Sequence, residues 1–246
     1  MTVREPAAGP PGPSRRDAAV ARSIDPARVR VEKRLQRFLD AALELVSGAD
    51  GRDFTVQEVV ERSGQSLRSF YQNFGGKHEL LLALFEESVR ASAEHLRSLI
   101  ADETDPLARL RLFTIEYYVL CAPLPGDPPV PKAAPAGAIA EFAQRLLTEH
   151  PKEAARAYLP LVVLVEELLV GATAVGSVRA GTDRRRLAGT VLSMIMFNQF
   201  SMTIGSAGAA AAAHERVAAA EELWQLLLTG IATNGPNGRR GEPDRM

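Results

Sequence analysis

A short polar stretch between Ser66 and Asn73 carries side chains that are suited to reading nucleic-acid bases. The forked guanidinium of Arg68 can donate two hydrogen bonds to guanine, and the amides of Gln72 and Asn73 can pair in a similar way with adenine. Such pairs discriminate between bases only when a rigid element holds them in the major groove of DNA. The residues around the stretch therefore decide whether this chemistry is used.

Two short helices joined at a glycine are expected to hold the stretch. Thr55 and Glu58 have the spacing of a capping box, so a helix should begin at Thr55. Gly64 permits a close turn, and Ser66 can cap a second short helix that ends near Asn73. Two such helices behind a longer first helix form a helix-turn-helix.

The amphipathic pattern assigns a role to each face of these two helices. The apolar residues expected to pin the helices together are Val59, Val60, Leu67 and Phe70. The polar residues expected to face outward are Arg68, Ser69, Gln72 and Asn73.

The same region resembles the TetR family of transcriptional regulators. The family pattern has a threonine at a helix start, an apolar pair, a small residue before glycine and a serine-containing turn, followed by tyrosine, phenylalanine, lysine and a leucine pair. In this sequence those positions are Thr55, Val59-Val60, Ser63-Gly64, Ser66, Tyr71, Phe74, Lys77 and Leu80-Leu81, with Glu79 also fitting. The sequence departs from the pattern at Gln65, where an apolar residue is usual, and at Arg68-Ser69, where a pair of small residues is usual.

The resemblance implies roles for individual residues. Thr55, Tyr71 and Lys77 would contact phosphates, and such contacts fix the register on DNA without carrying sequence information. Arg68 is the first choice for a contact to a base, with Gln65 and Gln72 next. The complete set of expected DNA-contacting residues is Thr55, Gln65, Ser66, Arg68, Ser69, Tyr71, Gln72, Asn73 and Lys77.

The rest of the chain is expected to be helical, because no segment alternates as a strand does. The fold class is therefore all-α. We expect a disordered basic arm over residues 1–24, a three-helix DNA-binding domain over 25–75 that begins at Asp25-Pro26, a larger domain for effector binding and dimerisation over 76–233, and a disordered tail over 234–246. The arm could add contacts to the DNA backbone or minor groove.

Prolines mark the breaks in the larger domain. Residues 122–137 hold six prolines and are expected to form a loop. Pro160 should kink or split a helix that is expected over 152–180. Other helices are expected over 138–149, 183–206 and 214–232.

One short recognition helix contacts too few bases for useful specificity, so two copies in a homodimer should read a palindromic operator. We expect the last two helices to form the dimer interface through Leu192, Met196, Phe200, Val217, Leu223, Trp224 and Leu227. The middle helices should bind a small, largely apolar effector through Phe113, Tyr117, Phe142, Val165, Glu166, Met194, Phe197 and Asn198. The sequence thus predicts a ligand-responsive regulator, with repression as the mode that the resemblance implies.

Several other functions are not supported by the sequence. It has no P-loop, dinucleotide fingerprint or nucleophile elbow, so we expect neither an enzyme nor a cofactor. His78, His95, His150 and His214 lack metal-site spacing, so no metal is expected. The single cysteine and the absence of an apolar run over residues 1–13 favour the cytoplasm.

Two alternatives stay open. The first is a helical protein that binds DNA without sequence preference and has no effector. The second is a membrane-associated helical protein, because residues 187–213 carry no charge and are long enough to span a bilayer. Polar residues inside that segment favour a buried interface helix instead.

Overall fold

The computed structural model describes residues 15–48, 53–124, 126–134, 136–181, 183–205 and 213–233. Within these ranges the regular secondary structure is helical, apart from an isolated antiparallel bridge between Val178 and Ala232. The helices are α1 (Arg15–Val46), α2 (Val56–Ser63), α3 (Leu67–Asn73), α4 (Lys77–Leu99), α5 (Pro106–Cys121), α6 (Ala136–Glu149), α7 (Pro151–Ala157), α8 (Leu159–Ala174), α9 (Arg184–Gly205) and α10 (Ala213–Ile231). The expected all-α class is confirmed.

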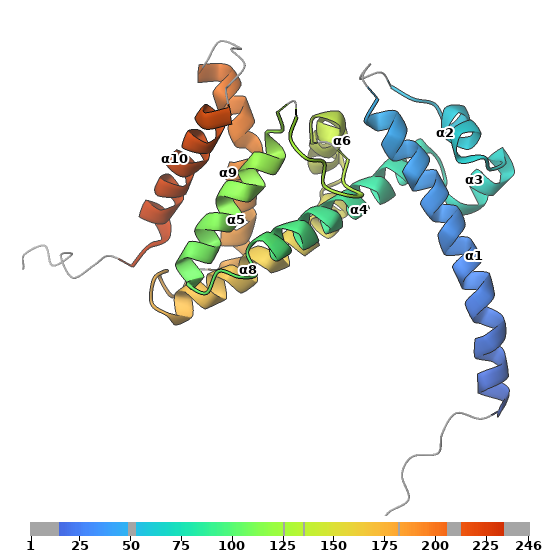
Figure 1. Ribbon diagram of the computed structural model, residues 1–246, viewed down its shortest axis with the longest axis horizontal. Helices are drawn as coiled ribbons and strands as arrows, with labels where there is room; N and C mark the ends of the chain where they lie inside the picture. Colours follow the sequence, from blue (N-terminus) through green and yellow to red (C-terminus); the bar gives the residue numbers. More distant parts are fainter. Residues whose placement is uncertain are drawn as a thin grey trace, which may run out of the picture.

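The helices form two bundles of unequal size. Figure 1 shows α1, α2 and α3 as a small bundle at one end, and α5–α10 as a larger one. Helix α4 belongs to both, because it contacts α1 at one end and lies along α8 for the rest of its length (Figure 1). The small bundle corresponds to the expected DNA-binding domain.

Helix α1 begins at Arg15, well before the expected start at Asp25-Pro26. The helix passes through Pro26, and the segment before this proline is rich in alanine, which has the highest helix propensity. The expected disorder over residues 1–24 is therefore wrong for Arg15–Ile24. Residues 1–14 and the expected tail at 234–246 lie outside the described residues.

The capping signals place α2 and α3 as predicted. The Glu58 backbone N–H donates to the Thr55 hydroxyl at 3.2 Å, and the Thr55 backbone N–H donates to the Glu58 carboxylate at 2.8 Å. Gly64 ends α2 in the left-handed conformation, with a φ of 63° that favours glycine. Ser66 then caps α3 by accepting from the Ser69 backbone N–H. The turn between the two helices is therefore fixed by local bonds.

Aromatic packing holds α3 in place. The ring of Phe38 on α1 meets the rings of Phe70 and Phe74 edge to face, at centroid distances of 5.6 and 6.0 Å. Val59, Val60 and Phe70 are buried as predicted. The prediction for Leu67 is wrong, because 44% of its surface is exposed. Leu67 is the first residue of α3, so its side chain, which points toward the N-terminal end of the helix, has no preceding helical turn to pack against.

The helices of the larger domain are interrupted at the positions that the prolines predict. Helices α7 and α8 meet at a bend of 58° next to Pro160, so the expected split is confirmed. The proline-rich segment after α5 is a loop, and the bidentate ion pair between Asp127 and Arg216 ties it to α10. Among the described residues no single helix is long and apolar enough to cross a membrane, although the bent pair of α7 and α8 is when taken together.

Replacement of Phe70 by alanine should destabilise the small domain by about 3–5 kcal/mol, because it removes a fully buried ring and leaves a cavity. Urea denaturation followed by far-UV circular dichroism measures the change. The matched control is Gln72→Ala on the exposed side of α3, which should stay within about 0.5 kcal/mol. Equal effects of the two substitutions would contradict the proposed packing.

Candidate functional site

Helix α3 lies at the outer edge of the small domain (Figure 1) and carries exposed polar side chains. The side chains of Arg68 and Gln72 are exposed, and Tyr71 exposes 58% of its surface. The Tyr71 ring rests edge-on against Phe70, at a centroid distance of 5.3 Å, so its phenol is directed outward from a fixed base. These three residues form a rigid surface that could enter a groove.

Two residues of α3 do not face outward as expected. Ser69 exposes 9% of its surface, and its hydroxyl oxygen has no hydrogen-bond partner among the described residues. The half-buried Asn73 donates its side-chain amide to the Ser69 carbonyl oxygen at 2.7 Å. Because Phe70 must face the core, the helical period also turns its neighbours Ser69 and Asn73 inward. The outward assignment of Ser69 is therefore corrected.

The residues expected at the edges of α3 are held by contacts within the domain. The half-buried Gln65 donates its amide to the Gly64 carbonyl oxygen at 3.3 Å. Lys77 forms an ion pair with Asp53, and its ammonium lies 4.6 Å from the centre of the Phe54 ring. The hydrogen bond from Lys77 holds the pKa of the Asp53 carboxyl below its usual value. A phosphate would have to compete with Asp53 for this lysine.

The exposed hydroxyls of Thr55 and Ser66 stand at the starts of α2 and α3. Each accepts a hydrogen bond from the first turn of its own helix. The fold thus brings Thr55, Ser66, Arg68, Tyr71, Gln72 and Lys77 into one small domain around α3.

A second candidate site is a cavity of about 420 Å³ in the larger domain. Helices α4, α5, α6, α8 and α9 and the proline-rich loop contribute to its walls, which are mainly apolar. Of the residues expected to bind an effector, Tyr117 and Phe197 line it. So does Met196, which was expected at the dimer interface.

The other expected effector residues lie elsewhere. Phe113 and Val165 are fully buried in the core, and Phe142 faces a separate crevice beside α1. Asn198 donates to the Tyr118 hydroxyl at 3.0 Å. Glu166 and Met194 do not line the cavity. Helical spacing identifies apolar faces without telling a packed core from the wall of a cavity, so the sequence did not separate these residues from those that line it.

The sequence did not indicate that the proline-rich loop forms a wall of the cavity. Leu124, Val130 and Ala134 of the loop line it, and the Ala134 backbone N–H donates to the Ser88 hydroxyl of α4 at 2.9 Å. The buried Arg216 guanidinium beside Asp127 lowers the pKa of that carboxyl to about 2. Apolar residues between the prolines were the available signal for this role.

Polar groups of the cavity were missed as well. Glu116, His95 and Ser92 line it together with Cys121 and the phenol of Tyr158. Burial raises the pKa of Cys121 to about 12 and raises the pKa of Tyr158 well above its ordinary value. The thiol and this phenol are therefore neutral at physiological pH and can donate hydrogen bonds to a bound molecule.

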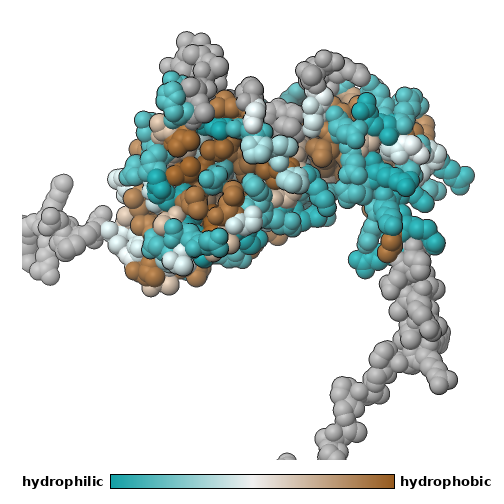
Figure 2. Space-filling view, viewed as in Figure 1, coloured by the Kyte–Doolittle hydropathy of each residue, from teal (hydrophilic) through white to brown (hydrophobic). Residues whose placement is uncertain are grey.

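Most residues expected at the dimer interface are buried within the single chain. Leu192, Leu223, Trp224 and Leu227 pack into the core, because α9 and α10 turn their most apolar faces toward α5 and α8. The side chain of Phe200, also expected at the interface, lies outside the described residues. Figure 2 shows apolar side chains gathered over the larger domain. Among the side chains that the structure describes on α9 and α10, the large apolar residues that are exposed are Met194, Phe197, Val217 and Leu226.

Residues 38–84 match the family model for bacterial regulatory proteins of the tetR family. This match contains the whole ordered pattern from Thr55 to Leu81 and confirms the resemblance that the sequence predicted. No curated protein matches the chain in sequence.

Solved structures share the fold over nearly their entire length. A TetR-family regulator from Pectobacterium atrosepticum is 19% identical with a TM-score of 0.63, over 84% of this chain and 98% of its own. FadR from Bacillus subtilis in complex with stearoyl-CoA is 18% identical with a TM-score of 0.58, over 80% and 98%. SmeT, the repressor of the Stenotrophomonas maltophilia efflux pump SmeDEF, is 17% identical with a TM-score of 0.54, over 86% and 97%. These likenesses show the two-domain helical fold.

The raised pKa predicts that Cys121 reacts slowly with iodoacetamide in the folded protein. Burial disfavours the thiolate, so at pH 8 the rate should be on the order of a hundredfold or more below that of the urea-unfolded chain. Because the pKa is about 12, the rate should still rise about tenfold per pH unit near pH 9.5. A reaction rate that stops rising near pH 9 would show a thiol with an ordinary pKa and contradict the burial of Cys121.

Proposed function

We propose that this chain, which carries the N-terminal domain of the TetR family, is a ligand-responsive and sequence-specific regulator of transcription. The observation that carries the proposal is the exposed face of α3, where Arg68, Tyr71 and Gln72 stand on a helix capped at its start and anchored by Phe70. Arg68 and Gln72 contact bases, and Tyr71 contacts a phosphate together with Thr55 and Lys77.

The regulator acts as a homodimer on a palindromic operator. A helix as short as α3 contacts few base pairs, so two copies at about 34–36 Å give the required specificity. The exposed Val217 and Leu226 on α10 and Met194 on α9 support a partner surface on these two helices. This surface replaces the buried residues that the sequence suggested.

The effector is a small, largely apolar molecule that occupies the cavity. Its volume of about 420 Å³ lies in the range of small-molecule sites, and an apolar lining with few polar groups is typical of them. Two solved proteins of the same fold support this proposal. FadR from Bacillus subtilis is in complex with stearoyl-CoA, and SmeT is the repressor of a multidrug efflux pump. Glu116, His95 and Tyr158 are among the polar groups available to orient the ligand.

Helix α4 transmits the occupancy of the cavity to the DNA. Phe85, Ser88 and Val89 of α4 line the cavity, and the same helix begins at Lys77, three residues after Phe74 of the aromatic cluster. A ligand that favours one tilt of α4 changes the spacing of the two recognition helices and releases the operator. It acts only through different affinities for the two arrangements.

Selection of sheared genomic DNA by the purified protein tests the DNA-reading role. The wild type should recover fragments that share a palindrome, and Arg68→Ala should weaken binding to that site by about 1–3 kcal/mol and relax the preference at one position of each half-site. Arg90→Ala on the exposed surface of α4 is the control. Uniform recovery of all fragments, unchanged in Arg68→Ala, would contradict the assignment and favour a DNA-binding protein without sequence preference.

Filling the cavity tests the effector site. Ala143 lines the cavity on α6, so Ala143→Trp should abolish the fluorescence enhancement of anilinonaphthalene sulfonate, an apolar probe, at this site. Ala174→Trp, at the exposed end of α8, is the control for an added tryptophan and should bind the probe as the wild type does. Equal probe binding by all three proteins would show that the cavity does not take apolar ligands.

A further inference from the structure

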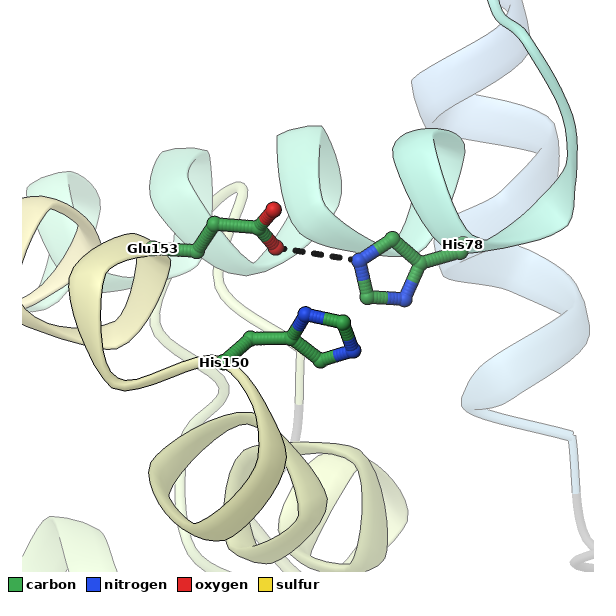
Figure 3. A group of neighbouring side chains, drawn as sticks. All are labelled: His78, His150 and Glu153. Carbon is green, nitrogen blue, oxygen red and sulfur yellow. Dashed lines mark hydrogen bonds and ion pairs between the residues drawn. The ribbon is translucent and has the colours of Figure 1, made fainter.

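We propose that His78, His150 and Glu153 bind a divalent transition-metal ion of the zinc type at the junction of the two domains. Figure 3 shows the three side chains converging from two elements. One potential ligand atom from each residue lies within 4.8 Å of the other two. Two imidazoles and a carboxylate are a ligand set that zinc accepts, with a fourth position left to water.

The geometry is close to that of a bound ion. The Nε2 of His78 is 3.0 Å from the Glu153 carboxylate, and the rings of His78 and His150 are 4.8 Å apart at their centroids. Tetrahedral ligands at about 2.0–2.1 Å from zinc are roughly 3.4 Å from one another. Rotation of the half-exposed side chains is enough to close the remaining gap. The hydrogen bond between His78 and Glu153 is then replaced by two bonds to the metal.

The three residues stand on well-fixed backbone. His150 precedes α7 and Glu153 lies in its first turn, so their spacing of three residues puts both side chains on one face. His78 is the second residue of α4, and its ring packs against Phe142 at a centroid distance of 5.7 Å. Two ligands therefore come from one helix start in the larger domain, and the third comes from the point where α4 leaves the small domain.

The surroundings favour a cation and leave it accessible. His78 and His150 line a crevice of about 590 Å³ between the small domain and α6, and Glu141 and Glu149 line it too. Two cations also line the crevice, and each is paired with a carboxylate: Lys77 with Asp53, and Arg145 with Glu141 at 3.6 Å. Sequence spacing gave no sign of this site, because His78 and Glu153 are 75 positions apart and meet only through the fold.

A metal at this site would change the orientation of the small domain that carries α3, a consequence that rests on the proposed function. The ion adds a link between the start of α4 and α7, which are otherwise joined by the hydrogen bond between His78 and Glu153 and by the ion pair between Glu86 and Arg156. Metal binding therefore favours one orientation of the small domain. By reciprocity, operator DNA changes the affinity for the metal by the same factor as the metal changes the affinity for DNA.

Metal binding is tested on the untagged full chain after chelator treatment and dialysis. Isothermal titration with Zn²⁺ should give one ion per chain, and Co²⁺ should give visible absorption bands. His78→Asn and His150→Asn should each weaken binding by roughly tenfold or more. His214→Asn removes an exposed histidine on α10 and is the matched control that should bind as the wild type does. Circular dichroism verifies that each variant is folded.

Equal Zn²⁺ affinity of the wild type and the folded His78→Asn and His150→Asn variants would overturn the site, as would equal weakening by His214→Asn. The regulatory consequence has its own readout, the affinity for the recovered palindrome with and without Zn²⁺. A shift in the wild type that is lost in His150→Asn supports the coupling. An unchanged affinity overturns the coupling and leaves both the metal site and the DNA-binding role standing.

Discussion

The structure depends on the continuity of α4, a single helix of 23 residues that both domains share. Its first turns complete the small domain beside Phe74, and its later turns carry Ser88 and Val89 into the wall of the cavity. A continuous helix is stiff over this length, so its two ends cannot move independently. The chain passes from α3 into this helix within four residues, and the cavity and the histidine cluster both include residues of α4, so this helix is the physical basis for the proposed regulation.

Features set by neighbouring residues could be predicted from the sequence. The capping box of Thr55 and Glu58, the left-handed Gly64 and the break near Pro160 each depend on a few adjacent positions. The family model over residues 38–84 rests on the same local order. The small domain was therefore predicted in nearly all its elements, including the exposed Arg68, Tyr71 and Gln72.

Features set by packing between distant segments could not be predicted. Trp224 looked like an interface residue because its helix is strongly apolar, yet it is buried against the chain's own core. Only two of the expected effector residues, Tyr117 and Phe197, line the cavity, since a helical period does not reveal which apolar contact is left open. The meeting of His78 with Glu153 depends on the path of the whole chain between them.

The most direct test of the account is to locate α3 on DNA by site-directed cleavage. An iron chelate attached at Gln72→Cys, in a Cys121→Ser background, should cut the recovered palindrome at two clusters about one helical turn apart, one for each half-site. The same chelate at Glu94→Cys, on the exposed surface of α4, should leave that DNA uncut. Cleavage that is scattered evenly, or equal from both positions, would contradict the claim that α3 is the element that reads DNA.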